Sequence, residues 1–235
     1  MSGKLILIPT PIHESLPLEP VAQSMLLENA LDEKTIIAVE EHKVGRQRWL
    51  KWGLPRECIE HFVLFNEHTS SKEIPELVKK LKAGFNIYLM SDGGLPAFCD
   101  PGQKLIESCH KQGIKVTSTP FPNSIALAVS LSGFPHDTFY FAGFIPLKSP
   151  EREASLKRLA LSPEMSILMD TPYRLGKILS ELQELLPANR EIFLASDLNS
   201  PDELLLRGPI QTIINSLKPS EKREFILLIA PQQRP

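Results

Sequence analysis

Short apolar runs alternate with longer stretches of mixed polarity through the first half of the chain. Each of these runs is predicted to be a strand: Leu5–Ile8, Thr35–Val39, His61–Phe65, Asn86–Met90 and Lys115–Ser118. The stretches between them carry apolar residues at the spacing of one helix face: Val21–Leu31, Arg46–Trp52, Ile74–Ala83 and Lys104–Gln112. Strands that alternate with helices predict a largely parallel sheet. Because the runs are apolar at nearly every position, helices are expected on both faces of this sheet.

The second half of the chain predicts a sheet of a different kind. Its expected strands are Thr138–Ala142, Met165–Asp170, Glu191–Ala195, Leu204–Arg207 and Glu224–Ile229. Its expected helices are Ser124–Ser132, Pro150–Leu161, Tyr173–Leu186 and Ile210–Leu217. No helix separates the strands predicted at residues 191–195 and 204–207, which indicates antiparallel pairing and therefore a mixed sheet.

The segment Thr117–Asn123 contains two prolines and interrupts the alternation midway along the chain. A chain of 235 residues is long enough for two small domains. We therefore predict the α/β class with two α/β domains, one over residues 1–118 and one over residues 119–235. Open α/β sheets bind ligands beyond the carboxyl ends of their strands, so a ligand cleft is expected between the two domains.

Composition narrows the class of protein. Hydrophobic residues make up 42% of the chain and charged residues 23%, and these proportions exclude a disordered chain. The formal net charge of −2 excludes a domain that binds nucleic acid through an overall basic field. A local basic patch is still compatible with this charge.

The sequence gives little support for disulfide bonds, a metal site or a membrane-spanning segment. The cysteines, Cys58, Cys99 and Cys109, form no CxxC pair and the histidines lie in no HExxH pattern, so no metal site is expected. An odd number of scattered cysteines indicates a reducing compartment. No apolar stretch reaches the roughly 18 residues of a membrane span, and the apolar run at the N-terminus is short for a secretory signal. We therefore expect a soluble, cytoplasmic protein with no membrane association.

Two loops of the first half carry candidate chemistry. Residues 9–12 follow the first strand, and their two prolines make a stiff ligand wall or simply a rigid turn. Residues 91–102 join a strand to a helix, and this loop is longer than the usual connection of about 2–6 residues. Adjacent glycines at 93 and 94 permit close approach of a ligand to the backbone. Asp100, which precedes Pro101, is also typical of a helix N-cap.

Three other segments combine helix ends or cations with a candidate binding role. Asn123 is a good N-cap, and the helix that it starts would also present amides to a ligand. Residues 43–52 hold four cations together with Trp49 and Trp52, which suits RNA binding through phosphate contact and base stacking. An amphipathic helix that buries both tryptophans explains the same pattern. A further set of cations offers RNA a second place to bind: Lys148, Arg152, Lys157 and Arg158.

An ordered set of motifs along nearly the whole chain resembles a known family. The motifs are Leu5–Ile12 (LILIPTPI), Ala38–Lys43 (AVEEHK), Ser91–Gly102 (SDGGLPAFCDPG), Ser132–Phe134 (SGF), Phe139–Pro146 (FYFAGFIP), Thr171–Arg174 (TPYR), Arg207–Gly208 (RG) and Glu224–Ile229 (EFILLI). In this order and spacing they resemble the tetrapyrrole methylase superfamily of S-adenosylmethionine (SAM)-dependent methyltransferases. Within it the chain is most similar to the branch that methylates ribose 2′-hydroxyls of small-subunit ribosomal RNA.

The resemblance implies a two-domain enzyme, usually a homodimer, with SAM as its methyl donor and without a metal. Position by position, it implies cofactor contacts at Pro11, Asp92, Gly93, Leu95, Phe98, Asn123, Ser124, Asp170, Thr171 and Leu198. It implies RNA or a ribosomal subunit as the partner. We therefore predict SAM-dependent methylation of ribosomal RNA.

A ribose hydroxyl that accepts a methyl group needs a proton acceptor within hydrogen-bond reach. Glu41 and Asp100 are the candidate catalytic acceptors, and Lys43 is the candidate for orienting a phosphate. The chain departs from the pattern of the branch at residues 13–14, which read His-Glu instead of Gly-Asn, and at residues 41–43, which read Glu-His-Lys instead of Asp-Thr-Arg. These changes leave two alternatives open: a methyltransferase for a small acceptor such as a tetrapyrrole, and a non-catalytic SAM-binding protein.

Overall fold

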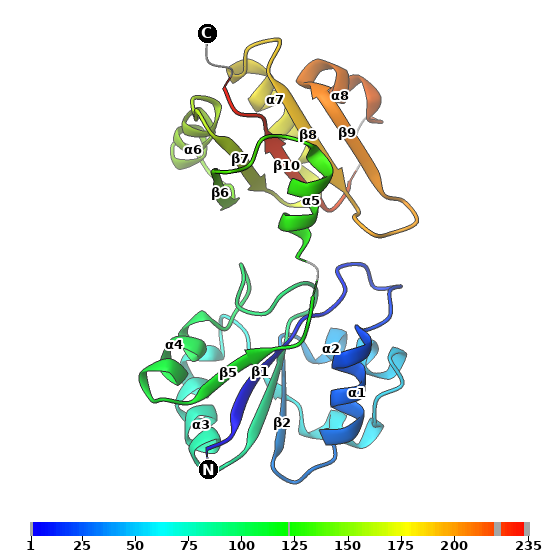
Figure 1. Ribbon diagram of the computed structural model, residues 1–235, viewed down its shortest axis with the longest axis vertical. Helices are drawn as coiled ribbons and strands as arrows, with labels where there is room; N and C mark the ends of the chain where they lie inside the picture. The colour runs from blue at the N-terminus through cyan, green and yellow to red at the C-terminus, as the bar shows by residue number, and fades with distance from the viewer. Residues whose placement is uncertain (1, 122, 219–221, 233–235) are drawn as a thin grey trace. The chain divides into compact units, whose positions relative to one another are not determined.

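The computed structural model describes residues 2–121, 123–218 and 222–232 (Figure 1). The chain divides into two compact units, Met1–Phe121 and Pro122–Pro235, which are called the first and the second unit and are described separately. Within the described ranges no helix is long and apolar enough to cross a membrane. Each unit is built around its own five-stranded sheet.

The first unit alternates strands and helices. Its strands are β1 (Lys4–Ile8), β2 (Thr35–Val39), β3 (Val63–Leu64), β4 (Asn86–Met90) and β5 (Lys115–Ser118). Its helices are α1 (Pro20–Asn29), α2 (His42–Lys51), the 3-10 helix η1 (Arg56–His61), α3 (Ser70–Lys82) and α4 (Gln103–Lys111). The strand order is β3-β2-β4-β1-β5 and every neighbouring pair is parallel. The parallel sheet predicted from the sequence is therefore confirmed.

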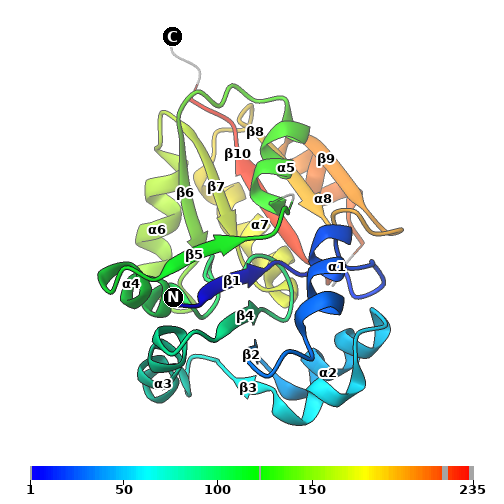
Figure 2. The same cartoon turned by 60° about the horizontal axis from the view of Figure 1, so that its bottom comes forward.

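Helices cover both faces of this sheet, because side chains of each strand point alternately to opposite sides. Ile87 and Leu89 of β4 pack in a core with α3 and α4. Tyr88 and Met90 of the same strand pack in a second core with α1, α2 and η1. Figure 2 shows α1 and α2 on one side of the strands and α3 and α4 on the other.

Several elements of the first unit differ from their predicted bounds, among them α3, which begins at Ser70 instead of Ile74. Helix α2 begins at His42 instead of Arg46, because Gly45 fits inside it: a Cβ atom there would lie 3.0 Å from the Val39 side chain. Because Gly45 has no side chain, it lets α2 approach the end of β2 closely, and the helix continues through it. Strand β3 is only two residues long, because residues 56–61 form η1 instead of extended chain.

The second unit contains a mixed sheet. Its strands are β6 (Phe139–Phe144), β7 (Met165–Met169), β8 (Glu191–Ser196), β9 (Leu204–Pro209) and β10 (Phe225–Ile229). Its helices are α5 (Ser124–Ser132), α6 (Glu151–Ala160), the 3-10 helix η2 (Pro172–Arg174), α7 (Leu175–Leu185) and α8 (Ile210–Ser216). The strand order is β6-β7-β10-β8-β9, in which β6 and β7 are parallel and the other pairs are antiparallel. The predicted mixed sheet is confirmed, including the antiparallel pairing of β8 and β9.

Strand β10 lies at the centre of this sheet and is buried along its whole length. Ile226 and Leu228 pack beneath α5, whereas Leu227 and Ile229 face α6, α7 and α8. Because β7 and β8 are both antiparallel to β10, their carboxyl ends lie at the same edge of the sheet. The segments that follow them are therefore neighbours around the start of β10.

Candidate functional site

The carboxyl edge of the first sheet gathers the loops that follow β1, β2, β4 and β5, because all these strands run in the same direction. The loops after β1 and β4 are joined directly. Thr10 and Gly94 exchange two backbone hydrogen bonds of 2.9 Å. The buried Thr10 hydroxyl also donates to the Ser91 carbonyl at 3.1 Å. The two candidate loops of the sequence therefore form one structure.

The loop of residues 91–102 has an unusual backbone. Ala97 and Cys99 adopt φ angles of +66° and +64°, a region that costs an L-residue about 1–2 kcal/mol. Gly102 has a φ of +141°, and a Cβ atom there would lie 2.8 Å from the Cβ atom of Ala97. Backbone strain of this kind is concentrated at functional sites, which favours a functional loop over a simple connection.

The prediction that Asp100 is the N-cap of the next helix is wrong. Helix α4 begins at Gln103, its N-cap is Gly102, and no side-chain hydrogen bond caps it. Asp100 instead lies near Glu40 and Asp92. Burial, followed by repulsion from these two carboxylates, raises its pKa to about 6, although a hydrogen bond from Ser91 opposes the rise.

Glu40, Asp92 and Asp100, the carboxyl cluster, bring together the ends of β2 and β4. The Asp92 amide donates to Glu40 Oε2 at 3.1 Å, and the Glu41 amide donates to Asp92 Oδ1 at 3.3 Å. Burial, and then Glu40, raise the pKa of Asp92 to about 6 against the opposing effect of Arg48. Two carboxyl groups that change charge just below neutral pH are suited to exchanging a proton with a ligand.

Helix α2 holds the loop after β1. Arg48 donates to the Pro11 carbonyl at 2.5 Å and to the Ile12 carbonyl at 3.5 Å. Burial lowers the pKa of Arg48, while Asp92 and Glu14 oppose this effect. Lys51 donates to the Glu14 carbonyl at 2.7 Å. Two cations of the predicted basic patch are therefore engaged within the protein.

The two tryptophans of the same patch are buried. Trp49 is fully buried and donates to the Pro55 carbonyl at 2.7 Å, and Trp52 is 5% exposed. Neither ring can stack on a base, so that part of the RNA interpretation is wrong. The amphipathic-helix interpretation is confirmed. Lys43 and Arg46 are the cations of the patch that lie on the exposed side of α2.

The carboxyl edge also has groups that suit a ligand with both polar and apolar parts. Pro11 is buried and Leu95 is half-buried, whereas Phe98 is 39% exposed. The Oγ1 atom of Thr119, just after β5, is buried and has no hydrogen-bond partner among the residues that the structure describes. A buried hydroxyl in this state is costly unless a ligand or a water molecule completes its bonding. Their chemistry is compatible with the SAM contacts that the resemblance implies for this loop, which stay a prediction.

The sequence reasoning missed Glu40, Ser91 and Thr119. Each residue directly follows a predicted strand of the parallel sheet, so its position at the carboxyl edge was available as a signal. The hydrogen bonds and the buried state that distinguish these residues depend on contacts between loops that are far apart along the chain.

In the second unit, Asn123 caps α5 as predicted. Its Oδ1 atom accepts from the amides of Ile125 at 2.8 Å and Ala126 at 3.2 Å, and Ser124 is the first helical residue. The side chain of Asn123 is therefore used within the helix end. The predicted contact of both residues with the cofactor stays a prediction.

Asp170 forms a buried ion pair directly after β7. Its Oδ2 atom accepts from Arg152 Nη1 at 2.8 Å, and both side chains are 1% exposed. Arg152 also donates to the Pro146 carbonyl and to both carboxylate oxygens of Glu181. The expectation that Arg152 offers its charge to RNA is wrong, because that charge is neutralised inside the protein. Asp170 Oδ1 in turn accepts from the Thr171 amide at 2.8 Å.

Leu198 is 6% exposed and packs in the core beneath α5, shortly after β8. The last residue of β8, Ser196, is fully buried, and its hydroxyl has no hydrogen-bond partner among the described residues. Asp170 and Leu198 follow neighbouring strand ends of the second sheet. The predicted residues that follow strands thus lie in two sets, one at the carboxyl edge of the parallel sheet and one where β7 and β8 end, on either side of β10.

Acidic and metal-binding side chains are not arranged as a metal site in the described part of the chain, where no group of three or more His, Cys, Asp or Glu residues could hold an ion. In the carboxyl cluster, Glu40 and Asp92 each accept a hydrogen bond from a backbone amide, and Asp100 has a hydrogen bond with the Ser91 side chain.

Comparison with known proteins identifies the family. A family model described as Tetrapyrrole (Corrin/Porphyrin) Methylases matches residues 28–214. The chain is 32% identical to Ribosomal RNA small subunit methyltransferase I of Thermotoga maritima over 91% of each chain. It is 31% identical to the protein of the same name from Vibrio cholerae, over 96% of this chain and 76% of that protein.

Solved structures show the same fold at low sequence identity. A uroporphyrin-III C-methyl transferase from Thermus thermophilus, complexed with S-adenyl homocysteine, has a TM-score of 0.54 and 15% identity over 97% of both chains. A conserved hypothetical protein from Aeropyrum pernix K1 has a TM-score of 0.66 and 15% identity over 100% of this chain and 86% of that one. The family model, the relatives and the fold agree, and the chain belongs to the tetrapyrrole methylase family of methyltransferases.

Proposed function

We propose that this methyltransferase transfers a methyl group from SAM to a ribose 2′-hydroxyl of small-subunit ribosomal RNA. The relatives from T. maritima and V. cholerae are both named as methyltransferases of that RNA, and the similarity extends over at least 76% of each protein. The structural observation that carries the proposal is the carboxyl cluster, which lies beside a strained loop at the carboxyl edge of a parallel sheet.

The residues proposed to hold SAM in the first unit lie in the joined loops after β1 and β4: Pro11, Asp92, Gly93, Leu95 and Phe98. Those proposed in the second unit follow β7 and β8 or begin α5: Asn123, Ser124, Asp170, Thr171 and Leu198. When bound, SAM supplies a methyl group on a positively charged sulfur. The apolar side chains exclude water from that group, and the loops fix its direction of transfer.

Asp100 is the proposed proton acceptor for the ribose hydroxyl. With a pKa of about 6 it is largely a carboxylate at pH 7.5, yet it is more basic than an ordinary aspartate. Glu41 is the second candidate, because its backbone amide is held by Asp92 and its side chain is exposed. Lys43, in the first turn of α2, is the candidate for holding the phosphate beside the reacting ribose.

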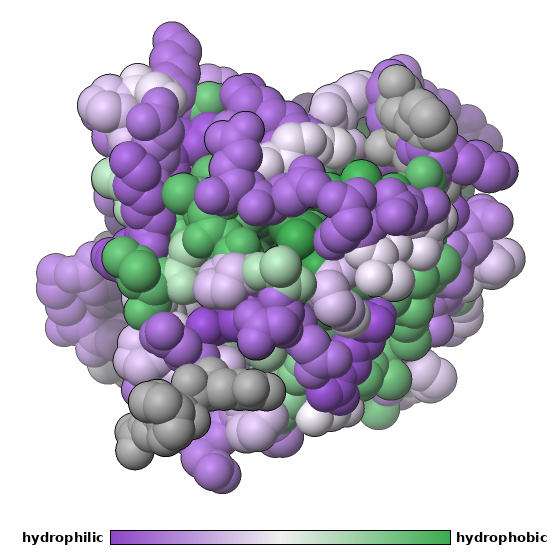
Figure 3. All heavy atoms as spheres, turned by 90° about the horizontal axis from the view of Figure 1, so that it is seen from above, coloured by the Kyte–Doolittle hydropathy of each residue, from purple (hydrophilic) through white to green (hydrophobic). Residues whose placement is uncertain are grey.

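The protein is proposed to act in the cytoplasm as a homodimer, with a small ribosomal subunit as its partner. Exposed large apolar side chains of the second unit offer surface for a second copy: Phe139, Phe144, Leu147, Leu161 and Tyr173. Figure 3 shows apolar side chains exposed among hydrophilic ones on one face of the molecule. Sedimentation of the purified protein tests this proposal, since a dimer has twice the mass of 26.4 kDa.

The proposed function is tested by calorimetric titration with SAM and by incubation with labelled SAM and small ribosomal subunits. Binding of SAM and incorporation of label into RNA are expected. Binding of SAM without label in RNA would contradict the RNA acceptor and favour a small acceptor or a non-catalytic protein. Absence of SAM binding would contradict the cofactor assignment itself.

A further inference from the structure

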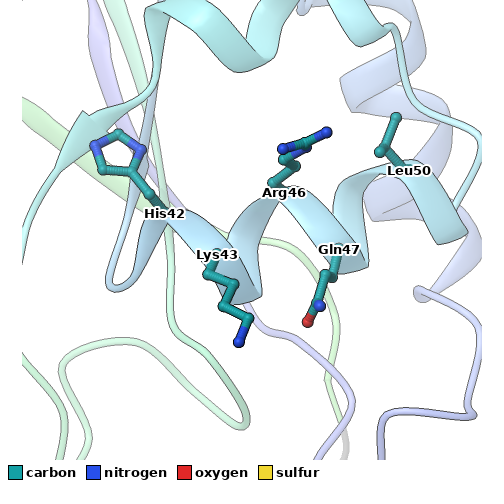
Figure 4. A pocket seen from close by; sticks show the side chains of 5 residues that line it. All are labelled: His42, Lys43, Arg46, Gln47 and Leu50. Carbon is teal, nitrogen blue, oxygen red and sulfur yellow. The ribbon is translucent and has the colours of Figure 1, made fainter.

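The exposed side of α2 carries a pocket of about 500 Å³ that the proposed reaction does not use as a whole. It is lined by His42, Lys43, Arg46, Gln47 and Leu50, and these five residues define the α2 pocket. Figure 4 shows Arg46 and Leu50 projecting from one side of the helix and Lys43 and Gln47 from the other. The residues that line the pocket thus come from two neighbouring rows of one helix.

The cations of the α2 pocket are available to a ligand. Among residues 2–121, 123–218 and 222–232, no carboxylate pairs with Lys43 or Arg46, unlike Arg48 and Lys51 on the same helix, whose charges are used on backbone carbonyls. Lys43 and Arg46 lie three residues apart, which puts their Cβ atoms about 5–6 Å from each other. This separation lets the two long side chains reach two different anionic groups.

The pocket also has an apolar component. Leu50 is 40% exposed at one end of it, although α2 buries its other large apolar residue, Trp49, completely. The aliphatic stems of Lys43, Arg46 and Gln47 extend this apolar surface, because long polar side chains expose their charged ends and keep their stems along the protein. A ligand that fits the α2 pocket must therefore carry several negative charges and also flat or apolar groups. Single-stranded RNA has this chemistry.

The position of the pocket along the chain favours RNA further. His42 directly follows Glu41, whose amide is bonded to Asp92 of the carboxyl cluster. A strand of RNA held on α2 would therefore have one end beside the groups proposed to accept the ribose proton. An acidic protein surface would gain the same charge attraction, but it would bring neither a nucleobase to pack against Leu50 nor a ribose hydroxyl to the carboxyl cluster.

We infer that the α2 pocket is a docking site for a single-stranded segment of the RNA substrate. Lys43 and Arg46 bind successive phosphates, and a ribose or base packs against Leu50. This inference rests on the proposed function for the identity of the RNA. It goes beyond that function by adding to the phosphate contact proposed for Lys43 a second phosphate contact at Arg46 and apolar packing at Leu50.

The test compares two variants of equal charge. The first is the double substitution Lys43→Gln with Arg46→Gln. The control is Lys79→Gln with Lys82→Gln, two exposed lysines of α3, which packs on the opposite face of the sheet. Binding of a labelled single-stranded RNA of about twelve nucleotides is measured by fluorescence anisotropy at several salt concentrations, and SAM binding is measured by calorimetry.

The first variant is expected to bind the RNA about tenfold more weakly at about 0.1 M salt. Its plot of log affinity against log salt should be shallower by about 1.4, or 0.7 for each lost phosphate contact. Leu50→Ala should weaken binding about fivefold with the slope unchanged, since it removes apolar contact only. SAM affinity should stay the same in every variant.

Equal RNA affinity and equal salt dependence in the two charge variants would overturn the inference, even if labelled RNA is still produced. Selective loss of affinity in the first variant, together with no methylation of RNA by the wild type, would support the docking site and contradict the proposed reaction. Selective loss of binding to an acidic peptide, with RNA binding intact, would assign the α2 pocket to a protein partner and overturn the inference.

Discussion

Asp100 has surroundings that favour its protonated form, and this has opposite consequences for activity and for stability. Burial and two neighbouring carboxylates raise its pKa to about 6, whereas an aspartate in an unfolded chain has a pKa of about 3.9. The folded protein therefore binds more protons than the unfolded one between these pH values. The free energy of unfolding therefore falls as the pH rises from about 4 to about 6, and this loss of stability is complete above about pH 7.

Asp100→Asn should lower the methylation rate by about 10²–10⁴-fold, the range for loss of a positioned base. SAM affinity should change little, because the amide keeps the shape of the side chain. For the wild type, the rate should fall as the pH falls below about 6, where Asp100 becomes protonated. Single-turnover rates with saturating RNA measure both effects, and a variant as active as wild type would remove Asp100 from the mechanism.

The same variant should be more stable than the wild type at pH 8. After allowance for solvent screening at this partly exposed position, the gain is expected to be about 1 kcal/mol. The difference should disappear below about pH 3, where the wild-type carboxyl is neutral in both the folded and the unfolded state. Urea unfolding at the two pH values measures it. A variant that is less stable at pH 8 would contradict the account of the carboxyl cluster.

At the scale of elements, the loop of residues 91–102 depends on Gly102 for its closure onto α4. Gly102→Ala should destabilise the protein by about 2–3 kcal/mol, because a Cβ atom there would lie 2.8 Å from Ala97 in a backbone conformation with a φ of +141°. Gly53→Ala is the matched control, since its φ is also positive but no atom lies within 4 Å of the added Cβ. Chemical denaturation should show a loss of only about 1 kcal/mol for the control.

Arg152 connects three elements of the second unit: α6, the end of β7 and α7. Arg152→Met should cost about 3–5 kcal/mol, since it leaves Asp170 buried without its ion-pair partner. Arg158→Met on the exposed side of the same helix should cost under about 1 kcal/mol. Thermal unfolding of both variants measures the difference, and equal losses would show that the buried ion pair contributes nothing specific.

The elements that the sequence predicted best are those buried on both faces. Strands β2 and β4 have the predicted bounds, because residues such as Ile37 and Leu89 continue an apolar run that has no solvent-facing break. The edge strand β5 also has its predicted bounds, although most of its residues are exposed. Helix α2 was predicted to begin four residues late, since an internal glycine weakens a helical pattern unless the neighbouring strand is known.

The sequence predicted which loops form the candidate site, but it did not predict the hydrogen bonds and ion pairs that they make. Residues 91–102 stand out by length and by their glycines. The N-cap prediction for Asp100 was wrong, because Gly102 takes the N-cap position and Asp100 lies near Glu40 instead. Both facts depend on contacts that form only in the folded chain. Arg152 was misassigned for a similar reason: a charged helical residue is usually exposed, and only the fold brings Asp170 to it.

At the scale of the whole molecule, a weakly acidic protein is proposed to bind RNA, which is highly anionic. The net charge of −2 gives no general attraction for RNA, so affinity must come from local groups such as those of the α2 pocket. The proposal that depends most on this local binding is the methylation of a ribose hydroxyl of small-subunit ribosomal RNA.

The most direct measurement is the position of the transferred methyl group. Small ribosomal subunits are incubated with the protein and labelled SAM, and the RNA is then hydrolysed with alkali, which cannot cleave beside a methylated 2′-oxygen. We expect the label in alkali-resistant dinucleotides, and we expect Asp100→Asn to lower the rate at which it appears there by about 10²–10⁴-fold. Label in mononucleotides would show methylation of a base, and label only in small molecules would show a different acceptor. Either result would contradict the account.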